Sequence, residues 1–235
     1  MLFTLASAAS LLAASSLAVP VSTASKVIAR DGQITCSPSY LGAGKGGGRL
    51  ILNNSTPNGT SAAGRPIPYV AKSISGDPLS AALVVNPDNI DDVYRFYSCS
   101  SKSLGVEAKE TVRDDEGNDM TTDYGLLVKT SKNAGDQPLT DGNFQCIVSS
   151  QSPPEEDHFH SPLFVSPCTL EDIAEKQNRQ FWSVSEGSLV FKYRGLPEFE
   201  HYLKTRDGTL DKAQTILVQQ GQDVRFNGLY FEDLD

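Results

Sequence analysis

The chain has 235 residues, of which 39% are hydrophobic and 21% charged, a balance typical of a globular protein rather than a disordered one. Its formal net charge is −9 and its cationic residues are scattered singly, which excludes a protein built to bind the nucleic-acid backbone. The length fits one large all-β domain or two small ones.

The N-terminal segment, residues 1–24, is predicted to be a secretory signal peptide. Residues 2–19 are small or apolar, and the apolar stretch 11–19 is shorter than the about 20 residues that a membrane-spanning helix needs. Small residues at the cleavage positions predict processing after Ala18 or Ala24. We therefore expect a secreted protein without membrane insertion, folded as one domain over residues 33–235.

Short apolar runs between clusters of Gly, Pro, Asn, Asp and Ser predict strands along the rest of the chain. The expected strands are 35–36, 49–52, 67–71, 82–85, 94–99, 125–129, 144–148, 163–165, 179–184, 188–193, 201–205, 215–218 and 224–231. A single helix is expected over residues 169–177, with Thr169 as its N-cap and acidic residues in its first turn. This pattern predicts an all-β domain with one short helical turn.

Asparagine sequons predict glycosylation of the first long loop. Asn53, Asn54 and Asn58 each begin an N-x-S/T sequence within a polar stretch, so residues 53–64 are expected to form an exposed loop. Crowding between the adjacent Asn53 and Asn54 would let only one of them carry a glycan.

The four cysteines, an even number in a secreted chain, predict two disulfides. They are Cys36, Cys99, Cys146 and Cys168, and their spacing leaves three pairings open. None forms a C-x-x-C pair, which argues against a zinc or redox site.

An internal repeat organises the strands. A strand opening on glycine occurs at Gly48, Gly125 and Gly187, and each is followed by three further strands of recurring types. Three units of four strands, about twelve in all, are the pattern of a β-trefoil.

The middle unit resembles a ricin-type (ricin B-like) lectin, of the divergent kind secreted by fungi. The likeness covers about residues 144–196 and rests on Pro167-Cys168, the N-x-Q-x-W segment Asn178-Arg179-Gln180-Phe181-Trp182, and the following Gly187-Ser188-Leu189. The flanking units have Arg95-Phe96-Tyr97 and Arg225-Phe226-Asn227 in place of Gln-x-Trp. We expect the aromatic residues of these segments to fill the core. They are Phe96, Phe181, Trp182 and Phe226.

The resemblance implies a disulfide pairing and a sugar site. It pairs Cys146 with Cys168, which leaves Cys36 for Cys99. It also implies carbohydrate binding through Asn178 and, in the third unit, Asp207, although no Asp follows Cys146 as it does in the family. The expected partners are therefore glycans or glycoproteins.

Other chemistry is not indicated by the sequence. The polar segment 155–160 has two His residues, but the prolines on both sides favour a solvated loop over a metal site. No cofactor motif and no catalytic constellation is recognised, so we expect a protein that is not an enzyme.

Two alternatives to a lectin stay open. Kunitz-type soybean trypsin inhibitors are similar secreted, acidic β-trefoils, and an inhibitor would present an exposed segment such as 100–122 or 151–161 to a protease. The other alternative is a structural or host-interaction protein whose lectin fold no longer binds sugar.

Overall fold

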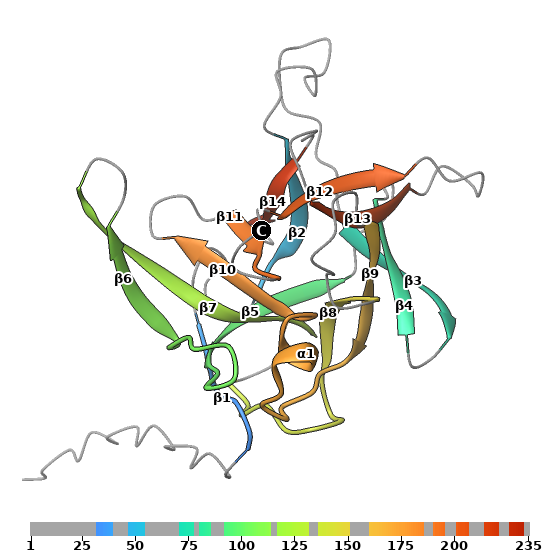
Figure 1. The fold of residues 1–235 in the computed structure, drawn as a ribbon. Helices are drawn as coiled ribbons and strands as arrows, with labels where there is room; N and C mark the ends of the chain where they lie inside the picture. The colour runs from blue at the N-terminus through green and yellow to red at the C-terminus, as the bar shows by residue number, and fades with distance from the viewer. Residues whose placement is uncertain are drawn as a thin grey trace, which may run out of the picture.

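The computed structural model describes residues 32–39, 47–54, 71–77, 80–85, 92–113, 117–131, 136–150, 160–185, 190–195, 201–206, 214–220 and 226–232. In this part of the chain the fold is mostly β, with one short helical turn (Figure 1). The strands are β1 (Thr35–Pro38), β2 (Arg49–Asn54), β3 (Ala71–Asp77), β4 (Ser80–Val85), β5 (Val93–Ser100), β6 (Lys109–Arg113), β7 (Asp119–Thr130), β8 (Gln145–Ser149), β9 (His160–Pro167), β10 (Phe181–Ser185), β11 (Val190–Tyr193), β12 (His201–Arg206), β13 (Gln214–Gln220) and β14 (Phe226–Glu232). The helical turn is α1 (Ala174–Gln177).

All strand pairs are antiparallel, and together they form one connected sheet. Its main path runs β1-β5-β7-β10-β11-β14-β12-β13-β4-β9-β8. Strand β2 pairs with β14, and a bridge joins Gly48, just before β2, to Tyr94 of β5 through two backbone hydrogen bonds of 2.9 Å. The all-β prediction is therefore confirmed for the described residues.

Three pairs of consecutive strands lie against one another on one side of this arrangement. The pairs are β3–β4, β8–β9 and β12–β13. One strand of each pair contacts the other two pairs, through β4–β9, β9–β13 and β13–β4 (Figure 1). Segments of all three predicted sequence units therefore meet here.

Most predicted strands are present, but one hairpin was missed. Strand β6 and the first half of β7 pair from Lys109↔Asp123 to Arg113↔Asp119, and Figure 1 shows this hairpin extending away from the other strands. Its polar sequence lacks the apolar runs from which the other strands were predicted. Of the predicted strand 67–71, only Ala71 lies within the described residues, at the start of β3.

The helix prediction was wrong at its N-terminal end. The helix begins at Ala174, its N-cap is Ile173, and no side chain caps it. Thr169 is not an N-cap because the chain after Cys168 uses its backbone groups in tertiary hydrogen bonds. Ile34 N donates to Leu170 O at 2.8 Å, and Leu170 N donates to Asp141 Oδ1 at 2.7 Å.

Three segments that were predicted to be exposed are also corrected. Asn53 and Asn54 belong to β2, where they pair with Gly228 and Phe226 of β14, so the loop expected over 53–64 does not include them. Asn58 lies outside the described residues. The segment 100–122 is not exposed throughout, since Ser101 is only 1% exposed. Ser161, the last residue of the predicted exposed segment 151–161, is fully buried.

The buried apolar side chains form two clusters. Phe96 and Trp182 belong to the larger one, where Phe96 lies 5.1 Å from the Phe191 ring. Phe181 belongs to the second, which surrounds both disulfides. All three predicted core aromatics whose burial is described have no exposed surface, and Phe226 lies in β14.

Strands β5 and β7 approach each other so closely at Gly125 that a side chain does not fit. A Cβ atom at this position would lie 1.8 Å from the backbone oxygen of Tyr97. The obstacle is backbone on a central strand, so it cannot move aside as a flexible side chain would. This contact explains why the strand begins its apolar run on a glycine.

Replacing Gly125 with Ala is expected to destabilise the fold by about 3 kcal/mol or more, because the two strands must separate. The control is Gly117→Ala, where φ is +85° but no atom lies within 4 Å of the added Cβ. It should cost only about 1 kcal/mol, for the left-handed backbone. Urea unfolding measures both; equal losses would contradict the close approach at Gly125.

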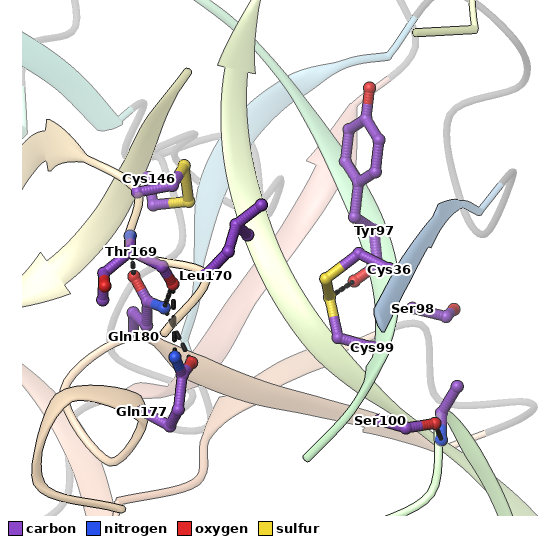
Figure 2. Close-up of a disulfide and its surroundings, with 12 residues drawn as sticks. Cys36, Tyr97, Ser98, Cys99, Ser100, Cys146, Thr169, Leu170, Gln177 and Gln180 are labelled. Atoms are coloured by element: carbon purple, nitrogen blue, oxygen red, sulfur yellow. Dashed lines mark hydrogen bonds between the residues drawn. A yellow bond between two sulfur atoms is a disulfide. The ribbon is translucent and has the colours of Figure 1, made fainter. Parts of the chain in front are cut away.

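Two disulfides join distant parts of the chain, in the pairing that the resemblance implies. Cys36 of β1 bonds to Cys99 of β5, directly opposite in the strand register, and Cys146 bonds to Cys168 (Figure 2). The first pair is separated by 63 residues and the second by 22. The first therefore attaches the edge strand β1, and the second closes the β8–β9 pair.

Removing the Cys36–Cys99 disulfide should cost more stability than removing the other. Loop-closure entropy gives about 4 kcal/mol for the longer loop and about 3 kcal/mol for the shorter one. Urea unfolding of the double variants Cys36→Ala/Cys99→Ala and Cys146→Ala/Cys168→Ala measures the difference. A larger loss from the Cys146–Cys168 pair would show that loop length does not dominate.

Candidate functional site

The N-x-Q-x-W segment begins at the end of α1 and runs into β10. Its glutamine, Gln180, is 1% exposed and binds the chain that follows the Cys146–Cys168 disulfide. Its Nε2 donates to Thr169 O at 2.6 Å and to Gln177 Oε1 at 2.7 Å, while Thr169 N donates to its Oε1 at 3.3 Å (Figure 2). The amide therefore acts as a buried brace between the Thr169 backbone and the Gln177 side chain.

A second buried amide completes this brace. Gln177 Nε2 donates to Glu171 O at 2.7 Å and to Thr169 O at 3.2 Å. Since both glutamines bond to backbone carbonyls, they hold residues 169–171 in a non-helical path. Gln177, the last residue of α1, and Gln180 together thus fix the short helical turn.

The two aromatic residues of the segment face different clusters, as alternate residues of a strand do. Phe181 packs in the cluster around the disulfides, and Trp182 packs in the larger core. The Trp182 indole N–H donates to Ile147 O at 3.4 Å, and its ring meets Tyr193 edge-on at 5.4 Å. These rings are structural and present no stacking surface to solvent.

A small pocket of about 250 Å³ lies against the N-x-Q-x-W segment; we call it the motif pocket. It is lined by Val148, Ser166, Pro167, Thr169, Lys176, Arg179 and Gln180. These residues come from β8, the end of β9, the chain after Cys168, α1, and the segment between α1 and β10. Its volume is below the about 300–1,000 Å³ of drug-sized ligand sites, so it suits one small group such as a single sugar ring.

Asn178, the predicted sugar ligand of the middle unit, neighbours the motif pocket in sequence but is not among its lining residues. It is 7% exposed, and its Oδ1 is buried without a hydrogen-bond partner among the described residues. Its carbonyl accepts a 2.7 Å hydrogen bond from the Tyr193 hydroxyl. Burial raises the pKa of this phenol, so it stays protonated and able to donate. Asp207, the other predicted ligand, lies outside the described residues.

The residues that line the pocket include two that sequence reasoning missed, Lys176 and Arg179. Arg179 occupies the unspecified position of the N-x-Q-x-W motif, so the motif itself gave no reason to select it. Lys176 was assigned only to the helical turn. Arg179 directly precedes Gln180 and Lys176 lies four residues before it, and this closeness to the motif was the available signal.

A larger hollow, of about 720 Å³, lies between the start of β1, the turn 101–106 and Asp172; we call it the polar groove. The Asp172 carboxylate accepts hydrogen bonds from Ser101 Oγ at 2.6 Å, Ser103 Oγ at 2.7 Å and Lys102 N at 2.9 Å. Burial would raise the pKa of Asp172, but these hydrogen bonds outweigh it and hold the pKa below its ordinary value. The carboxylate therefore fastens the turn, which leaves it little capacity for a ligand.

The described residues lack a metal-binding cluster and a membrane-spanning helix. They contain no group of three or more His, Cys, Asp or Glu side chains arranged to hold a metal ion. No helix in the described ranges has the length and apolar character required to cross a membrane. In the predicted solvated segment 155–160, only His160 falls within the description, as the first residue of β9.

Comparison with known proteins found no protein family model, no curated protein and no solved structure that matches this chain.

Replacing Gln180 with Ala is expected to destabilise the protein by about 2 to 3 kcal/mol, because Thr169 N and the buried Gln177 Oε1 lose the hydrogen bonds that they make with Gln180. The matched control is Gln137→Ala, which shortens an exposed side chain and should change the unfolding free energy by less than about 0.5 kcal/mol. Thermal and urea unfolding measure both variants. Equal stability of the two would show that the Gln180 amide is not a structural brace.

Proposed function

We propose that the chain is a divergent β-trefoil and that it binds carbohydrate without catalysis, as a secreted protein acting at a cell surface or cell wall. The strand pairings support the fold. Six strands follow one another through the links β5–β7, β7–β10, β10–β11, β11–β14 and β14–β2, and the Gly48–Tyr94 bridge joins β5 to the residue before β2. This order supports the barrel that we propose. The mutual contacts of β4, β9 and β13 supply the three hairpins that would cover one end.

The motif pocket is the observation that carries the proposed activity. It lies in the unit whose sequence resembles a ricin-type lectin, and the brace formed by Gln180 fixes its walls. Its lining combines hydroxyl and cationic donors with the apolar surfaces of Val148 and Pro167, a mixture suited to a sugar ring with polar edges and an apolar face. Glycans and glycoproteins are therefore the proposed partners.

The cellular setting agrees with this proposal. Two disulfides indicate an oxidising environment, which is found in secreted proteins. Residues 1–24 are proposed as the signal peptide that directs the chain there.

A glycan array with the mature chain tests the proposed function. Binding to a defined sugar should be lost in Ser166→Phe, which fills the motif pocket with an aromatic ring, and kept in Ser131→Phe, which adds the same ring at an exposed position. Circular dichroism and unfolding confirm that both variants fold. If Ser166→Phe still binds the sugar, the binding site lies outside the motif pocket. If the folded protein binds no glycan on the array, the result favours a lectin fold that no longer binds sugar.

The β6–β7 hairpin supports protease inhibition as the second candidate function. The end of this hairpin is exposed around residues 117–120, and it is attached to the rest of the sheet through β7, so it could be presented rigidly to an enzyme. Inhibition of one member of a serine-protease panel at a 1:1 ratio, lost when residues 114–117 are replaced by Gly and Ser, would favour this function over glycan binding.

A further inference from the structure

We propose that the motif pocket recognises the acidic group of a sugar, a carboxylate or a sulfate, in preference to a neutral sugar. This inference rests on the proposed glycan-binding function and names its ligand class. It follows from the charges that line the pocket, from the partners those charges have, and from the lack of carboxylates among the lining residues.

Arg179 is a fixed cation at the pocket. Its Nε donates to Ser149 O at 3.0 Å, which orients the planar guanidinium. No carboxylate among the described residues lies within ion-pair distance of it, in contrast to Arg95 and Lys129, which pair with Asp136 and Asp92. The remaining nitrogens donate to no described residue, so a ligand anion can take the two-pronged hydrogen bonds that a guanidinium offers.

Lys176 adds a second positive charge to the same pocket. It pairs with Glu171, but the Lys176 and Glu171 side chains are 45% and 52% exposed. Exposed ion pairs of this kind contribute little to stability, so a ligand anion can replace Glu171 as the partner of the ammonium group. Since the whole chain carries a net charge of −9, the clustering of two cations here is a local exception.

The rest of the lining agrees with this proposal. No residue that lines the pocket is an Asp or a Glu, and Val148 and Pro167 contribute apolar surface. The charged residues of the lining are Lys176 and Arg179. The pocket offers hydrogen-bond donors, and the acidic group of a sugar supplies the acceptors.

Isothermal titration of the mature chain with four probes tests the proposal. The probes are methyl β-glucuronide, glucose 6-sulfate, methyl β-glucoside and sodium sulfate. At least one acidic sugar should bind about tenfold or more tightly than the neutral glucoside and than sulfate alone, as expected for hydrogen bonds to charged groups. The carboxylate and sulfate probes distinguish the two kinds of acidic group.

Charge variants assign the binding to this pocket. Arg179→Gln and Lys176→Gln should each weaken binding of the acidic sugar about tenfold. Glu171→Gln, which frees Lys176, should strengthen it, a result that a purely structural role would not produce. Lys192→Gln, which removes an exposed charge that does not line the pocket, is the control and should have no effect.

Several outcomes would overturn the proposal. Preference for the neutral glucoside, lost in Ser166→Phe, would refute the acidic ligand while leaving the glycan-binding function intact. Acidic-sugar binding that neither Arg179→Gln nor Lys176→Gln weakens would place the site elsewhere, and sulfate binding as tight as that of either acidic sugar would show an anion site without sugar recognition. No binding of any probe, together with a blank glycan array, would refute both the acidic ligand and the function on which it rests.

Discussion

The middle part of the molecule depends on one buried carboxamide, that of Gln180. It bonds to both backbone groups of Thr169 and to the side chain of Gln177, so it joins the chain leaving the Cys146–Cys168 disulfide to the helical turn before β10. The core and the pocket both follow from this. The next two residues of the chain supply the buried rings of Phe181 and Trp182, and residues on either side of the amide supply the pocket walls.

This arrangement separates structural roles from the proposed binding role within a segment of five residues. Asn178, Gln180, Phe181 and Trp182 are buried, and each contributes to packing or backbone support. Arg179 is the member that reaches the pocket with a charge that no described carboxylate neutralises. In the proposed function, the buried positions of this segment support the fold and the cationic Arg179 sets the ligand chemistry.

The sequence predicted the parts of the structure that depend on local pattern. Apolar runs located most strands, and the aromatic residues of the N-x-Q-x-W segment are in the core as expected. The polar β6–β7 hairpin was missed because it is held by backbone hydrogen bonds between its strands and not by the burial of apolar side chains. The helix start was wrong because Leu170 bonds to Ile34 and Asp141, contacts between segments far apart in sequence. The pocket was missed for the same reason, since only the fold brings Val148 and Ser166 to the segment that carries Lys176 and Arg179.

A crystal structure of the mature chain in complex with methyl β-glucuronide would show whether the motif pocket binds an acidic sugar. We expect one sugar in the motif pocket, its carboxylate within hydrogen-bond distance of the Arg179 guanidinium and its ring against Val148 or Pro167. The Gln180 amide should keep its bonds to Thr169, because it supports the pocket and does not bind the ligand. A sugar bound in the polar groove or on the β6–β7 hairpin would contradict the proposed site if the motif pocket stayed empty.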